Sequence, residues 1–151
     1  LSLVCNAAYI HSRVRFEEGA PERDRPLAGQ SPYLVNAGLF YQHDDKGISA
    51  SLLYNRIGKR IESVGVPMQD QNEDIPDIYE MPRNSLDLTF SKKIGKAVEI
   101  KAGIQDMLNS KIEYKQFVKL TDQNGGKRER EQLVRSYRPG VDINVGVSLK
   151  F

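Results

Sequence analysis

The sequence predicts an all-β protein: an antiparallel up-and-down meander of about six strands. Two observations predict it. Apolar and polar residues alternate with a period of two in several segments, which is typical of strands with one apolar face. The connections between these segments also alternate between long and short, as they do when neighbouring strands run in opposite directions.

The C-terminal segment has the clearest alternation. Its apolar residues are Val141, Ile143, Val145, Val147, Leu149 and Phe151, and polar or small residues separate them. A helix would spread these side chains around its surface, whereas a strand places them on one side. The same pattern predicts strands near residues 1–14, 31–43, 47–61, 80–92, 97–118 and 130–151. We expect a bulge around Asp106–Asn109, and Pro139 cannot donate a hydrogen bond within the last strand.

Three connections are long and two are short. Residues 15–30, 62–79 and 119–129 form long polar loops, whereas residues 44–47 and 93–96 form tight turns. Alternate connections of a meander lie at the same end, so one end should carry only tight turns and the other only long loops. Outer-membrane barrels have this asymmetry, with short periplasmic turns and long extracellular loops.

Bulk composition excludes little. The 151 residues are 39% hydrophobic, the net charge is +2, and no apolar run is long enough for a transmembrane helix. The charge is too small to argue for a nucleic-acid partner. Cys5 has no second cysteine with which to form an internal disulfide. Because Leu1 already lies in an expected strand, we interpret residues 1–151 as a single partial domain.

Four segments, in this order and spacing, resemble the last part of a TonB-dependent outer-membrane receptor of the Bacteroidetes type. They are Arg25–Asn36, Met81–Leu88, Gln105–Asn109, and Tyr137–Gly140 with the alternation that follows it to Phe151. The resemblance covers nearly the whole chain. The charged final loop and the Tyr137–Gly140 sequence depart from the starch-type transporters, which favours a receptor outside that branch.

The resemblance implies that the chain is the C-terminal segment of a large transmembrane β-barrel of roughly 22 strands. The plug and the earlier strands would be absent. The parent would be a multi-pass protein of the Gram-negative outer membrane, taking up a scarce siderophore, peptide, glycan or vitamin. Its implied partners are the rest of the receptor, the TonB–ExbB–ExbD complex through the missing N-terminal part, the barrel-assembly machinery, and outer-membrane lipids with lipopolysaccharide. No cofactor, nucleic-acid partner or catalytic activity is expected.

Two sets of candidate site residues follow. Phe151, Leu149 and Val147 would form the C-terminal assembly signal, unless the chain only happens to stop there. The candidate extracellular-loop contacts are Arg23, Arg25, Asp70, Glu73, Asp74, Asp77, Lys127, Arg128 and Arg130. The basic cluster Lys127–Arg130, with Arg135 and Arg138, could contact lipopolysaccharide phosphates, and the acidic loop Asp70–Asp77 could bind Ca²⁺. A solvated loop is the preferred interpretation of both clusters. His11 and His43 are expected at opposite ends of the sheet, which argues against a shared metal site.

Two other classes of protein remain open. A soluble lipocalin-like ligand-binding barrel would also alternate, but it would turn its apolar face inward. A passive porin or adhesin barrel would place its faces as the receptor does, and only the order of the motifs argues against it. The direction in which the apolar face points therefore separates the soluble class from the membrane classes.

Overall fold

The computed structural model describes residues 1–16, 24–66, 75–95, 97–121 and 126–149. These residues form an all-β structure, and no helix occurs among them. The strands are β1 (Ser2–Tyr9), β2 (Tyr33–His43), β3 (Ile48–Ile57), β4 (Arg60–Ser63), β5 (Ile78–Glu80), β6 (Arg83–Ile94), β7 (Val98–Gln105), β8 (Ile112–Thr121), β9 (Lys127–Tyr137) and β10 (Asp142–Leu149).

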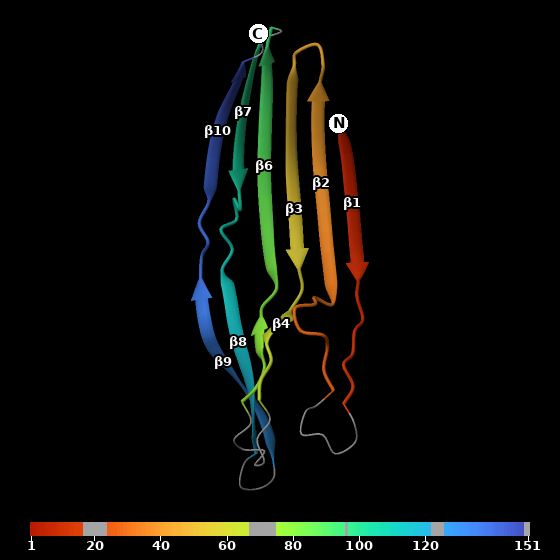
Figure 1. The fold of residues 1–151 in the computed structure, drawn as a ribbon, viewed down its shortest axis with the longest axis vertical. Coiled ribbons are helices and arrows are strands. Elements are labelled where there is room, and N and C mark those ends of the chain that lie inside the picture. Colours follow the sequence, from red (N-terminus) through yellow and green to blue (C-terminus); the bar gives the residue numbers. More distant parts are fainter. Residues whose placement is uncertain (17–23, 67–74, 96, 122–125, 150–151) are drawn as a thin grey trace.

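The strands form two antiparallel sheets that lie end to end (Figure 1). The six-stranded sheet, called the upper sheet after its place in Figure 1, has the order β1-β2-β3-β6-β7-β10. The four-stranded sheet, called the lower sheet, has the order β4-β5-β8-β9. Every strand pairs with the strand next to it along the chain within its sheet, which confirms the predicted meander. The described residues of the two tight turns lie at one end of the molecule, and those of the long connections lie toward the other end (Figure 1).

Four of the expected continuous strands, near 47–61, 80–92, 97–118 and 130–151, are wrong as single elements. Each is divided into two by a short interruption. Pro82 and Pro139 lie in two of these interruptions, where they remove a backbone donor. In a third, Asp106 and Asn109 adopt positive φ values of 50° and 43°, and the Asn109 N–H donates to the Asp106 carbonyl at 2.8 Å. The bulge expected at Asp106–Asn109 is thus a full turn.

Several boundaries also differ from the expected ones. The first strand ends at Tyr9 instead of near residue 14, with an isolated bridge between Val14 and Arg25 beyond it. The second long loop is shorter than 62–79, because β4 runs to Ser63 and β5 begins at Ile78. The third is shorter than 119–129, because charged residues of β8 and β9 continue to pair as far as Thr121 and Lys127.

The strand register continues through the interruption between the two sheets. Ile57 pairs with Arg83 at the end of the upper sheet, and Arg60 pairs with Glu80 at the start of the lower one. Both strands therefore advance by the same number of residues, and the alternation of faces carries over from one sheet to the other. The two sheets form one wall with two continuous faces.

The wall has almost no packed core. Ile61, Ile112 and Tyr114 are the only buried hydrophobic residues in the described ranges, and all three belong to the lower sheet. The described strands do not close into a barrel, and β1 and β10 form the two edges of the upper sheet. The stability that soluble domains draw from an enclosed core is therefore missing from most of this chain.

Candidate functional site

One face of the upper sheet is apolar across all six strands. A single row of register partners runs Leu3, Leu39, Leu52, Leu88, Ile104 and Ile143. None of these six side chains is buried, and exposure is greatest at the edge strands, where Leu3 is 68%, Ile143 is 70% and Val145 is 71% exposed. A contiguous apolar surface of this extent is rare on a soluble monomer and marks a surface that contacts another apolar phase or partner.

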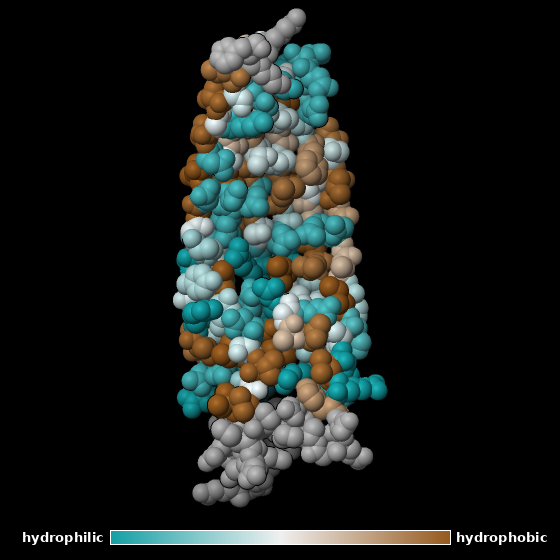
Figure 2. Space-filling view, viewed as in Figure 1, coloured by the Kyte–Doolittle hydropathy of each residue, from teal (hydrophilic) through white to brown (hydrophobic). Residues whose placement is uncertain are grey.

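The opposite face of the upper sheet is mainly polar and lines a hollow of about 670 Å³. Ser49 and Ser91 share a hydrogen bond of 2.7 Å across β3 and β6, and Asn144 lies at the rim of the hollow. Further along this face, Asn36 donates to Asn6 at 2.9 Å and accepts a hydrogen bond from Asn55. Hydrophilic and neutral side chains cover much of the middle of the upper part in Figure 2, and hydrophobic side chains line its two long edges.

The two faces of β10 meet different surroundings. Ile143, Val145 and Val147 are not enclosed in a sealed centre; they lie on the outer, exposed face. Their neighbour Asn144 contributes instead to the hollow on the concave side. The apolar face of the upper sheet is therefore its outer side, and the polar face borders the hollow.

Polar and aromatic side chains border the apolar face where the strands are interrupted. Arg56 donates to the Asn84 side-chain oxygen at 2.9 Å and reaches the Tyr33 hydroxyl at 3.4 Å, while Tyr54 donates to the same Asn84 oxygen at 2.9 Å. Tyr9 pairs with Tyr33 and shares this face. Tyr9, Tyr33 and Tyr54 thus gather at one level of the outer face.

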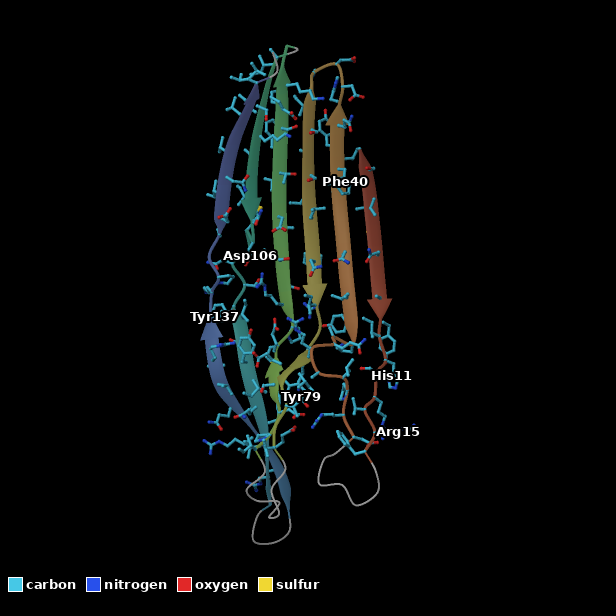
Figure 3. All side chains as sticks on the ribbon, viewed as in Figure 1. His11, Arg15, Phe40, Tyr79, Asp106 and Tyr137 are labelled. Carbon is cyan, nitrogen blue, oxygen red and sulfur yellow. The ribbon has the colours of Figure 1, made fainter. Side chains whose placement is uncertain are left out.

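The interruptions are joined to one another by side chains. Arg83 forms an ion pair of 3.3 Å with Asp106, whose N–H donates to the Asp87 carboxylate at 2.8 Å. Arg138 donates to the Asn109 carbonyl at 2.7 Å, and the Gly140 N–H donates to the Asn109 side chain at 3.0 Å. These contacts link β6, β7 and the chain before β10 at the level where the ladder hydrogen bonds lapse (Figure 3).

On the inner face of the lower sheet, the ammonium group of Lys59 lies between two aromatic rings. It is 4.1 Å from the centroid of Tyr79 and 3.7 Å from that of Phe117, and the two rings meet edge to face at 5.7 Å. Burial lowers the pKa of Lys59 below its ordinary value, while Glu129 and Glu131 act in the opposite direction. Burial, followed by Asp77, raises the pKa of Tyr79. Figure 3 shows Tyr79 among the strands of the loop side.

The predicted loop contacts come together only in part. Asp77 accepts a hydrogen bond from the Gly65 N–H at 2.7 Å. Asp77 raises the pKa of Tyr79, and Arg25 acts in the opposite direction. Charged groups of the first and second loops therefore both act on Tyr79. Arg128 and Arg130 lie on β9, away from this contact, because Lys127–Arg130 forms strand and not loop. Arg23, Asp70, Glu73 and Asp74 and the side chain of Lys127 lie outside the described residues.

The proposed assembly residues Val147 and Leu149 lie on the exposed apolar face of β10, at the tight-turn end; they are 63% and 59% exposed. Phe151 lies outside the described residues. Sequence reasoning missed the Lys59–Tyr79–Phe117 cluster, because its members are far apart along the chain and no local motif joins them.

His11 and His43 are confirmed at opposite ends of the wall, His43 at the end of β2 and His11 beyond β1 on the loop side (Figure 3). Within the described ranges, no three His, Cys, Asp or Glu residues are grouped to hold a metal ion. The same ranges contain no helix with the length and hydropathy needed to cross a bilayer. No protein-family model matches the chain, and no curated protein or solved structure matches it significantly.

Proposed function

We propose that this chain is part of the wall of a Gram-negative outer-membrane β-barrel, with the apolar face against lipid acyl chains and the polar face toward the lumen. The observation that carries the proposal is the two-sided upper sheet. Its exposed apolar row crosses all six strands, while polar side chains line the hollow behind it. Hydrocarbon offers backbone groups no hydrogen-bond partners, so a paired sheet with an apolar exterior suits that environment.

The dimensions support this proposal. On β6, outward apolar side chains extend from Leu86 to Ile94, close to the ~9–11 tilted residues that cross a bilayer. Lys92 lies within this span on the same face, and its ammonium group reaches the Lys46 carbonyl at the tight turn, at 2.5 Å. A long cationic side chain that extends toward the end of its strand is expected near a membrane interface. The bordering tyrosines would occupy the opposite interface.

Cys5 provides a direct test, because it is a free, exposed thiol on the apolar face of β1. We would label it with a small fluorophore in the full-length gene product and reconstitute the protein in vesicles of phosphatidylcholine with brominated acyl chains. We expect quenching several-fold stronger than in vesicles without bromine. The matched control, Cys5→Ala/Val4→Cys, moves the probe by one residue to the inner face and should be quenched much less.

Equal quenching at positions 4 and 5 would contradict a lipid-facing apolar face. No quenching at Cys5 in protein that has entered the vesicles would contradict it as well. A soluble ligand-binding barrel would not enter the vesicles and also predicts no quenching, because its apolar side chains would be enclosed. The polar side chains that line the hollow, among them Ser49, Ser91 and Asn144, argue against that alternative.

We further propose that the barrel is a TonB-dependent receptor for energy-coupled uptake, in which this segment supplies barrel wall and three outer loops. The order of the receptor-like motifs supports this step, and so does the long-loop end, where charged groups of two loops, Arg25 and Asp77, both act on the pKa of Tyr79. The test is the gene sequence before the codon for Leu1. It should encode a plug domain and roughly sixteen more strands. A gene that encodes no plug would leave a passive porin or adhesin barrel instead.

A further inference from the structure

The positive and negative side chains of strand β9 lie on opposite faces of the lower sheet. Arg128 and Arg130 alternate with Glu129 and Glu131, so the arginines lie on one side and the glutamates on the other. Glu131 forms an ion pair of 2.6 Å with Lys115, and both glutamates lie near Lys59 on the inner face. Within the described part of the chain, Arg128 and Arg130 form no ion pair with a carboxylate. The glutamates that could neutralise them are turned inward.

A bulge brings a third arginine to the same side. Tyr114 pairs with Arg135 and Lys115 pairs with Leu133, so Val134 is the extra residue. Without this shift, Arg135 would share the inner face with Glu131; with it, Arg135 lies on the face of Arg130, since a bulge redirects the side chains that follow it. The Arg135 guanidinium lies 4.2 Å from the Tyr114 ring centroid and remains 57% exposed.

This arginine face continues the apolar outer face. Arg60 and Glu80 lie on the outer side, because the register runs unbroken from Ile57–Arg83 to Arg60–Glu80. Glu80 pairs with Tyr114, and Tyr114 pairs with Arg135, which places Arg135 on the outer side too. The arginines therefore lie beyond the apolar band on the loop side of the wall. Under the proposed function, this is the level of the headgroups of the outer leaflet.

We propose that Arg128, Arg130 and Arg135 bind the phosphate groups of a phosphorylated glycolipid, the lipopolysaccharide of the outer leaflet, on the outside of the wall. The inference rests on the proposed function and adds a defined lipid contact to it. A planar guanidinium binds phosphate through two parallel hydrogen bonds. The inward glutamates leave Arg128 and Arg130 free to do so, whereas Arg135 has one long ion pair of 4.0 Å with Glu62 and remains 57% exposed. The adjacent apolar face would accept the acyl chains of the same molecule, which a soluble phosphate compound could not exploit.

The test measures binding of fluorescent lipopolysaccharide to the detergent-solubilised full-length protein. We expect the Arg128→Ala/Arg130→Ala/Arg135→Ala variant to weaken binding roughly tenfold or more, because three charge-assisted contacts are lost. The Arg→Lys triple variant should recover only part of it. Lys101→Ala removes one positive charge from the inner face of β7 and should leave binding unchanged. Chemically dephosphorylated lipopolysaccharide should bind the unmodified protein as weakly as intact lipopolysaccharide binds the alanine variant.

Unchanged binding in the alanine variant, or an equal loss with Lys101→Ala, would overturn the inference. So would full competition by inorganic phosphate at millimolar concentration, which would indicate a phosphate site with no lipid contribution. The Cys5 experiment distinguishes this failure from failure of the proposed function. A quenched Cys5 probe with unaltered lipopolysaccharide binding rejects the arginine site alone, whereas an unquenched probe rejects the membrane wall itself.

Discussion

At the scale of single residues, contacts across the sheet give a side chain an environment that its place in the alternating pattern does not predict. Lys59 follows the apolar alternation of β3 and would be expected to be a solvated charge. Instead it lies between Tyr79 and Phe117, from β5 and β8, at 4.1 and 3.7 Å from their centroids. Rings favour a cation by their quadrupole, but burial costs the ammonium group part of its hydration. The balance lowers its pKa.

This environment can be measured by titration. We expect the dimethylated Lys59 amine, followed by carbon-13 NMR, to lose its proton at a lower pH than in a Phe117→Ala variant. Removing the ring admits water, which favours the charged form and moves the pKa back toward its ordinary value. In the folded protein the lowered pKa makes protonated Lys59 unfavourable, so this contribution to stability improves as pH rises through the folded-state pKa. An unchanged titration in Phe117→Ala would show that burial by the ring is not the cause.

At the scale of elements, two tight turns set the register of the wall, and their glycines differ in surroundings. Gly47 and Gly95 both have positive φ values, 59° and 62°. A Cβ at Gly47 would lie 2.9 Å from the Lys93 Cβ, whereas a Cβ at Gly95 would meet nothing within 4 Å. The Gly47 carbonyl also accepts a hydrogen bond of 2.7 Å from the Lys93 N–H. The first turn is thus tied to β6, and the second is open.

We expect Gly47→Ala to be more destabilising than Gly95→Ala. Both add a side chain at a left-handed residue, at a cost of ~1–2 kcal/mol, and only the first also forces Lys93 to move. Urea unfolding in phospholipid vesicles measures the difference. Gly95→Asn should recover most of the loss at that turn, because Asn tolerates this conformation. Equal losses at the two turns would show that contact with Lys93 is unimportant.

At the scale of the whole molecule, the wall is two-sided and has almost no interior of its own. Only three hydrophobic residues are buried in the described ranges, while Ile143, Val145 and Val147 are each more than half exposed. The hydrogen-bonded backbone gives the wall its shape. Because the wall has almost no core, the stabilisation that a core normally provides must come from the surroundings of each face. Two adjacent residues of β10 face these two surroundings at the same level of the wall, since Val145 points outward and Asn144 points inward.

A charge placed on each of these two residues should therefore have opposite consequences. We expect Val145→Arg to destabilise the protein in vesicles by ~2–4 kcal/mol, because it places a guanidinium against hydrocarbon. Asn144→Arg should cost far less, because its side chain enters an open hollow whose lining includes Ser91 and Glu99. Reversible urea unfolding of the full-length protein in vesicles gives both values. Similar costs for the two variants, or a larger cost for Asn144→Arg, would reverse the assignment of the faces.

Much of this architecture was determined by the sequence alone. The period of two defines which side chains share a face, and the alternation of long and short connections defines a meander with its loops at one end; both depend only on local geometry. The strand interruptions at Pro82, Asp106–Asn109 and Pro139 could be predicted only in part. Proline and turn residues show that a strand can be interrupted there, but they do not show that neighbouring strands are interrupted at the same level.

Tertiary structure alone decided which face is concave, since alternation is identical for a wall seen from either side. It also decided the contacts that join distant segments. Lys59, just before β4, reaches Phe117 of β8 because β4, β5 and β8 are neighbours in the lower sheet. Arg135 reaches the outer face only because of the bulge at Val134. Such contacts depend on the register between strands. Hydrogen bonds and packing over the whole sheet set that register, so it cannot be predicted from the sequence of any one segment.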